Sequence, residues 1–399
     1  MNKKWEFKKL KDICISIDDG DWIESQDQSD DGIRLIQTGN VGFGEYLDKC
    51  DKSKYISEET FERLKCKEIF AGDCLVSRLP DPIGRACILP SMPLRMITAV
   101  DCSILRFKDS ITSNYFVHYT KSRAYNSDIS KYATGATRKR ISRKNLEGIL
   151  IPFPSLEEQQ RIVAELDCLN EMIAVKQELL KEFDRLTQSI FYDMFGDPVS
   201  NEKGWDIIEL GSKCEVTSFK RVLIKEVVDS GIPFIRGTEL MALSKATKGE
   251  KIDYTLFITP EHYERVKAIS GVPKEGDLLI PSINSDGNIW ILDTDEPRYY
   301  KDGRVLWVHV NHEAFSSEAL KYIMHILLKK TYSLMATGAT FAELKLFVLR
   351  ELKVPLPPLS LQQQFAEKIS AIEAQKELVK QSLDETQALL NYTMDKYFE

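Results

Sequence analysis

The chain has 399 residues, of which 43% are hydrophobic and 29% charged, and its formal net charge is −7. This composition is typical of two or three globular domains and excludes a disordered chain. No apolar run approaches the roughly 18 residues that a membrane span needs, and the N-terminus lacks the apolar stretch of a secretory signal. The eight cysteines include no C-x-x-C pair, so we expect reduced, buried thiols and no metal site. We expect a soluble, cytoplasmic protein without membrane contact.

The charge is unevenly distributed along the chain. Residues 101–150 have a net charge of +6 and residues 151–200 of −6, whereas residues 301–350 have +3 and residues 351–399 have −3. Each basic segment thus precedes an acidic one, and the two basic–acidic pairs are about 200 residues apart. A local basic face can bind phosphate even when the whole chain is acidic, so nucleic acid stays a candidate partner.

The first 150 residues show the pattern of a mixed α/β body. Short apolar stretches bounded by Gly, Pro or Asp predict strands at 32–37, 74–77 and 86–89. Residues 58–65 and 114–123 are predicted to form helices. The segment from Asp18 to Asp31 has seven acidic residues and no basic one, and we interpret it as a solvated loop that DNA phosphates would repel.

A basic segment closes this body. Residues 121–145 contain eight Lys or Arg and one Asp, and Thr134 to Arg140 joins a glycine turn to a basic cluster. Hydroxyls, exposed amides and guanidinium groups suit phosphate oxygens, and arginine also pairs bidentately with guanine. A solvated surface run is the alternative interpretation. Gln37 with Asn40, and Arg78 with Arg85, follow apolar strands, and Asn and Gln can recognise adenine edges.

A long helix is predicted next. Pro154 ends the preceding element and Ser155 is a plausible cap. Apolar residues then recur in alternating steps of four and three without Gly or Pro, which is the pattern of a helix that packs against another helix. About 40 residues at 1.5 Å each make a rod of roughly 60 Å. Lys176 and Thr187 interrupt this seam, and Gly196 is expected to end the helix.

The whole pattern then repeats, with an offset of 199 to 204 residues. Ala133 to Thr137 recurs unchanged as Ala336 to Thr340, and Gln159 recurs as Gln362. A repeat of this length indicates two copies of one domain with its tail. In the second copy we predict strands at 278–280 and 289–292 and helices at 260–267 and 316–329. Phe341 to Glu343 replace the basic cluster, so other residues would have to contact DNA.

The second tail repeats the heptad pattern, with every seam position shifted by 203 and Ser360 as the expected cap. The two helices are natural partners in an antiparallel pair, which would give the chain a pseudo-two-fold axis. The predicted seam consists of Ile162, Leu166, Leu169, Ile173, Leu180, Phe183, Ile190, Phe365, Ile369, Ile372, Val379, Leu383 and Leu390. The predicted fold is mixed α/β, with two tandem bodies separated by two long antiparallel coiled-coil helices.

Motifs for catalysis are missing from the sequence. It contains no phosphate-binding G-x-x-x-x-G-K-[ST] loop and no Asp/Asn-Pro-Pro-aromatic segment of amino-methyltransferases. His309 and His312 have an H-x-x-H spacing without further ligands nearby. We therefore predict no catalytic residue, although an enzyme with a hidden site is one alternative.

Two similar bodies, each followed by Pro-x-Pro, Gln-Gln and a long heptad helix, resemble the specificity subunit of type I restriction–modification systems. The resemblance rests on 151–160 with 133–137, on 354–363 with 336–340, and on the stretch from Asp19 to Asn40. It covers essentially the whole chain. It implies domains at 1–152 and 198–354 that each recognise half of a split DNA site, and spacer helices at 153–197 and 355–399.

The resemblance also implies the partners. They would be double-stranded DNA, two methyltransferase subunits docked on the helices, and restriction subunits. This chain would be non-catalytic and without a cofactor, and S-adenosylmethionine would bind to the methyltransferase. A coiled-coil adaptor without DNA binding and a specificity subunit of a methylation-only system stay open. The candidate DNA-binding residues are Gln37, Asn40, Arg78, Arg85, Gly135, Thr137, Arg138, Lys139, Arg140, Arg143, Lys144, Arg236, Ser282, Asn284, Asn288, Gly338, Thr340 and Lys345.

Overall fold

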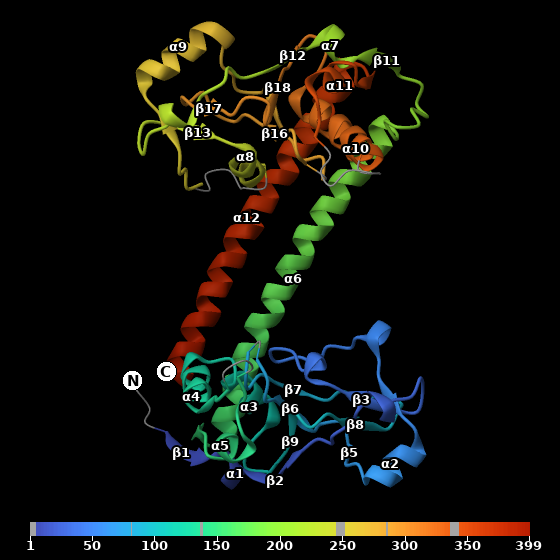
Figure 1. The fold of residues 1–399 in the computed structure, drawn as a ribbon, viewed down its shortest axis with the longest axis vertical. Coiled ribbons are helices and arrows are strands. Elements are labelled where there is room, and N and C mark those ends of the chain that lie inside the picture. The colour runs from blue at the N-terminus through green and yellow to red at the C-terminus, as the bar shows by residue number, and fades with distance from the viewer. Residues whose placement is uncertain (1–4, 81, 136–138, 245–251, 285, 336–342) are drawn as a thin grey trace. The chain divides into compact units, whose positions relative to one another are not determined.

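The computed structural model describes residues 5–80, 82–135, 139–244, 252–284, 286–335 and 343–399 (Figure 1). The chain divides into two compact units. The first unit contains Met1–Val175 and Leu383–Glu399, and the second contains Lys176–Ser382. Each unit therefore combines one body with part of each long helix.

Two four-stranded sheets form the first body, in the orders β2-β9-β6-β7 and β4-β3-β8-β5. The first sheet is antiparallel, and in the second β3 runs parallel to β8. A separate antiparallel pair, β1 with β10, brings the ends of the body together. The strands are β1 (Glu6–Lys9), β2 (Cys14–Asp19), β3 (Ile33–Ile36), β4 (Tyr55–Ile56), β5 (Glu68–Ile69), β6 (Cys74–Ser77), β7 (Ala86–Ile88), β8 (Met96–Thr98), β9 (Cys102–Phe107) and β10 (Leu150–Phe153).

Helices pack on the antiparallel sheet of the first body and on its outer strands. Tyr115 and Phe116 of α3 and Tyr125 of α4 share a buried cluster with Leu105 of β9 and Ile162 of the first long helix. The sheet thereby fixes the base of that helix. The helices are α1 (Leu10–Ile13), α2 (Glu58–Leu64), α3 (Ser113–Tyr119), α4 (Arg123–Tyr132), α5 (Arg143–Glu147) and α6 (Leu156–Phe195).

The second body repeats this plan with shorter sheets, in the orders β12-β18-β15-β16 and β14-β13-β17, and with the terminal pair β11-β19. Its strands are β11 (Asp206–Glu209), β12 (Glu215–Ser218), β13 (Ile232–Ile235), β14 (Phe257–Ile258), β15 (Leu278–Pro281), β16 (Trp290–Ile291), β17 (Tyr299–Tyr300), β18 (Val305–His309) and β19 (Lys353–Leu356). Its helices are α7 (Leu210–Lys213), α8 (Gly237–Leu243), α9 (Pro260–Ser270), α10 (Ser317–Met335) and α11 (Leu346–Arg350), followed by α12 (Leu359–Phe398).

Within each unit the two long helices pack against each other through residues of the predicted seam. In the first unit the beginning of α6 lies beside the end of α12, so the two run antiparallel, and Ile162 and Leu166 are fully buried. Tyr397 donates a hydrogen bond of 2.6 Å to Glu165 across this pair. In the second unit the Lys176 amine donates to Ser382, so this polar seam residue has a partner on the other helix.

Three local predictions are corrected by the structure. The helix predicted at 114–123 ends at Tyr119, because the chain turns there and a separate helix, α4, begins at Arg123 with the hydroxyl of Ser122 as its cap. Ser360 is not a cap, because α12 already begins at Leu359. The cysteines are free thiols as predicted, but Cys50 and Cys168 are exposed while the other six are buried.

Within the described ranges, no helix is long and apolar enough to cross a lipid bilayer.

Candidate nucleic-acid interface

A buried glutamine fastens each long helix to its body. Gln159 of α6 is fully buried; its carbonyl oxygen accepts from the N–H of Thr112, and its amide donates to the carbonyls of Ser110 and Pro154. Gln362 of α12 makes the equivalent three bonds in the second unit. The repeated glutamine is therefore a structural joint that sets how each helix leaves its body.

The basic segment of the first body lies between α4 and α5 (Figure 1). Thr134 and Arg140 pair as an isolated antiparallel bridge, which closes the loop between them. Gly135 and Lys139 in this loop are exposed, and so are Arg143 and Lys144 at the start of α5. Lys139, Arg143 and Lys144 give this part of the body an exposed cationic edge. Thr137 and Arg138, also predicted to bind DNA, lie outside the described residues.

Carboxylates beside this edge hold its arginines in place. A guanidinium nitrogen of Arg140 lies 3.0 Å from Asp101, and Arg143 lies 3.8 Å from Asp19. Asp19 also faces the buried Arg78 at 3.5 Å. The interpretation of 18–31 as a plain solvated loop is wrong at its beginning, because Asp18 and Asp19 belong to β2 and Asp19 is part of this charged cluster.

Several predicted DNA contacts of the first body are instead internal. Arg85 is 9% exposed and donates to the backbone carbonyls of Thr38, Val41, Leu79, Pro80 and Pro82. Asn40 is buried and bonds to Gln37 and Leu47, and Arg78 donates to the carbonyl of Val100. Gln37 is half-buried. This geometry gives Arg85 and Asn40 a structural role, and we leave both out of the candidate interface.

The corresponding edge of the second body has a different charge pattern. Glu343 stands 3.3 Å from Arg304 and 2.6 Å from the exposed Lys345. The hydrogen bond from Lys345 lowers the pKa of Glu343, so this carboxylate is ionised at neutral pH. Gly338 and Thr340 lie outside the described residues.

The other residues predicted for the second body are mostly engaged. Ser282 and Asn284 are buried, and the Asn284 amide donates to the carbonyl of Asn288. Arg236 donates to Glu239 within its own helix turn. Among the described residues predicted for this body, only Lys345 is exposed. Sequence reasoning missed Asp101 and Arg304, although their separation of 203 residues is the offset of the repeat.

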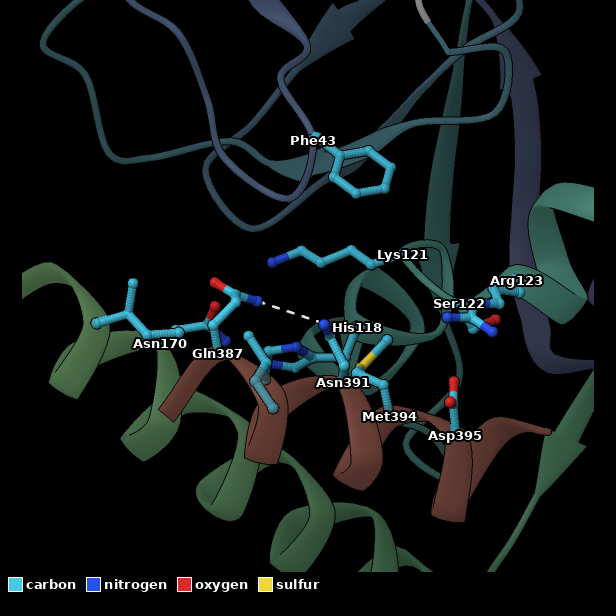
Figure 2. Close-up of a pocket in the computed structure, with 12 residues that line it drawn as sticks. Phe43, His118, Lys121, Ser122, Arg123, Asn170, Gln387, Asn391, Met394 and Asp395 are labelled. Carbon is cyan, nitrogen blue, oxygen red and sulfur yellow. Dashed lines mark hydrogen bonds between the residues drawn. The ribbon is translucent and has the colours of Figure 1, made fainter. Parts of the chain in front are cut away.

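A cavity of about 390 Å³ lies in the first unit, between the first body and helices α6 and α12. Figure 2 shows Lys121 between Phe43 and the helical residues Asn170 and Gln387. His118, in the wall, bonds to Asp167 at 2.7 Å. Burial lowers the pKa of His118 and also that of Lys121. The cavity lining combines amides, one amine and apolar groups, and none of these is paired with a nucleophile in the way that acyl-transfer chemistry requires.

Among the described residues, no cluster of three or more His, Cys, Asp or Glu side chains could hold a metal ion. His309, singled out for its H-x-x-H spacing, hydrogen-bonds through its ring nitrogen to the buried Asp277 at 2.9 Å. The charged edges around Arg140 and Glu343 are the candidate binding surfaces of the two bodies.

Comparison with known proteins agrees with this architecture. The model of the type I restriction modification DNA specificity domain matches residues 2–185 and 202–388. A putative type I restriction enzyme specificity subunit of Haemophilus influenzae is 26% identical over 65% of this chain, which spans 64% of that protein. A second, from Methanocaldococcus jannaschii, is 23% identical over 92% of this chain and 87% of its own length.

Solved structures share the fold along the full chain. The specificity subunit of a type I system from M. genitalium has a TM-score of 0.58 at 16% identity and covers all of this chain and 97% of its own. A chain from a study of type I system assembly has a TM-score of 0.62 at 16% identity, covering all of this chain and 98% of its own. With two matched domains over most of its length, the chain belongs to the family of the type I restriction modification DNA specificity domain.

Proposed function

We propose that this chain gives a type I restriction–modification complex its DNA sequence specificity. Each body recognises one half of a split DNA site, and the chain itself performs no catalysis. The observation behind this proposal is the duplicated specificity domain, in which each copy has its own charged edge and its own glutamine-fastened helix. Relatives that match this chain have the same subunit name.

The helices are proposed to set the gap between the half-sites and to dock two methyltransferase subunits. Apolar side chains outside the seam support docking, since Val175 of α6 is 61% exposed and Tyr392 of α12 is 67% exposed in the first unit. The acidic charge of both tails also suits a protein partner better than phosphate.

The partner chemistry follows from this assignment. Each methyltransferase would bind S-adenosylmethionine and modify an adenine in one half-site, after that base leaves the helical stack. Restriction subunits would join the same core in a cytoplasmic complex. A methylation-only complex would use this chain identically, because the difference lies in the other subunits.

Methylation of genomic DNA tests the proposal. The full chain is expressed with the methyltransferase encoded beside it, and modified adenines are mapped by single-molecule sequencing. We expect a split motif with one modified adenine in each half, which disappears when this chain is deleted. A folded complex without any split motif would contradict the proposal and favour an adaptor that does not bind DNA.

Two variants test the assigned parts. Replacing Arg138, Lys139 and Arg140 by Glu should weaken DNA binding and flatten its salt dependence, since each phosphate contact contributes to that slope. An unchanged slope would remove the basic segment from the interface. Inserting four residues after Leu180 should change the gap in the motif or prevent assembly. An unchanged gap in an assembled complex would show that α6 does not set the spacing.

A further inference from the structure

The two bodies use the same backbone scaffold where the chain returns from the basic segment to the sheet. In the first body the N–H of Ile141 donates to the carbonyl of Arg78 at 3.2 Å, and in the second the N–H of Leu344 donates to Ser282 at 2.7 Å. Immediately before these bonds Arg140 forms an isolated antiparallel bridge with Thr134 of its own loop, whereas Glu343 forms one with Ile283, just after β15. The two residues are 203 positions apart and are therefore equivalent.

An ion pair at this point has opposite polarity in the two bodies. Arg140 pairs with Asp101 at 3.0 Å, and Glu343 pairs with Arg304 at 3.3 Å. Asp101 and Arg304 are also 203 positions apart. Both members of the pair have been exchanged together, so a cation stands on the returning segment in one body and an anion in the other.

Stability of the fold does not explain which polarity is present. The four side chains are between 28% and 47% exposed, and ion pairs this open contribute little to folding. The same backbone accommodates both signs. The charge of Arg140 or Glu343 can therefore be set by an interaction outside the body. Both ion pairs lie at the edges that we assign to DNA.

We propose that Arg140 and Glu343 each specify one base of their half-site, an inference that rests on the proposed function. A guanidinium has only donors and matches the two acceptors of guanine in the major groove, whereas a carboxylate has only acceptors and matches the amino group of cytosine. Asp101 and Arg304 hold these groups in position. Lys345, 2.6 Å from Glu343, offsets the repulsion between this carboxylate and nearby phosphates.

The deciding experiment reverses the polarity of one pair without removing it. The double variant Arg140→Asp with Asp101→Arg is made in the full chain, expressed with its methyltransferase, and its methylation motif is sequenced. We expect base preference to change at one position of one half-site by roughly 5- to 150-fold, which is the range for one good base contact. The other half-site and the gap should stay as they are. The mirror variant Glu343→Arg with Arg304→Glu should alter only the other half.

A matched control reverses an ion pair elsewhere in the first body. Arg63 of α2 lies 2.5 Å from Asp27, and Figure 1 places α2 at the end of this body away from α5. Arg63→Asp with Asp27→Arg should leave the motif unchanged. If the Arg140 and Asp101 reversal also leaves it unchanged, the pair is only structural and the inference is wrong, while the proposed function stands. The absence of a split motif for the unmodified chain would instead defeat the proposed function.

A second variant decides the matter if the reversal prevents folding. Arg140→Lys keeps the positive charge and the pairing with Asp101, but an amine cannot donate two parallel hydrogen bonds to guanine as a guanidinium does. It should relax the preference at the same single position without weakening binding at the rest of the site. Full retention of that preference in Arg140→Lys would overturn the assignment of Arg140 to a base.

Discussion

Replacing Gln159 by leucine tests whether the buried glutamine is the joint between the first body and α6. Leucine has a similar volume but can make none of the three hydrogen bonds, so one N–H and two carbonyls lose their partner in a fully buried position. Each unpaired buried group costs about 1 to 3 kcal/mol, and the lower value gives about 3 kcal/mol for the three groups. We expect α6 to separate locally from the body far more often.

Hydrogen exchange at the amide of Thr112 measures this opening directly, because that N–H donates to Gln159. A local loss of about 3 kcal/mol corresponds to exchange roughly 150-fold faster. Local exchange is preferable to a single unfolding curve, because a chain with two units need not unfold in two states. The matched control is Gln160→Leu, an exposed neighbour whose replacement should change stability by no more than about 0.5 kcal/mol. Unchanged protection of Thr112 in the Gln159 variant would refute the reasoning.

Three further predictions concern stability. Burial keeps the pKa of His118 below its usual 6.5, so the folded state favours the neutral ring. The stability that this neutral ring contributes should be lost as the pH falls through the folded-state pKa. The melting temperature should therefore fall between pH 7 and pH 5, and a His118→Asn variant should lack this fall. Gly84→Ala should lower the melting temperature more than Gly72→Ala. Both have positive φ, but a Cβ at Gly84 would lie 3.0 Å from a side chain of α4, whereas at Gly72 it meets open space. Asp277→Asn should lower the free energy of unfolding by about 3 kcal/mol, because the buried carboxylate accepts hydrogen bonds from an indole, an imidazole and backbone N–H groups. Urea denaturation measures this loss, and an unchanged midpoint would contradict it.

Periodicity made the long helices predictable from the sequence, and the repeat made the doubled body predictable. Both signals arise from many residues, so local exceptions do not disturb them. The partner of Lys176 could not be predicted, because the Ser382 contact depends on the register between two helices that are far apart in the sequence. The break after Tyr119 was missed although Thr120 and Ser122 are poor helix formers, because no Gly or Pro marks it and only the cap by Ser122 shows the new start.

The candidate interface was predictable as a region but not residue by residue. A cluster of like charges indicates an exposed edge, because so many charges cannot be buried together. A single arginine in the sequence does not show whether its side chain is buried or exposed. Arg85 and Arg143 look alike in the sequence, yet the first satisfies backbone carbonyls inside the body and the second lies at the surface. Asp101 was missed because it stands 39 residues before its partner Arg140.

The two bodies differ in a way that suits two unlike half-sites. Inside each body an aspartate accepts hydrogen bonds at the equivalent position. In the first body Asp73 accepts from Arg106 at 2.8 Å, and in the second body Asp277 accepts from His309 at 2.9 Å. Aspartate stands at both positions, where it also accepts a hydrogen bond from a backbone N–H. At the edge, by contrast, the polarity of an ion pair has reversed. If Arg140 and Glu343 each specify one base, as we propose, the reversed ion pair lets the two bodies of one chain recognise different half-sites, and so an asymmetric site.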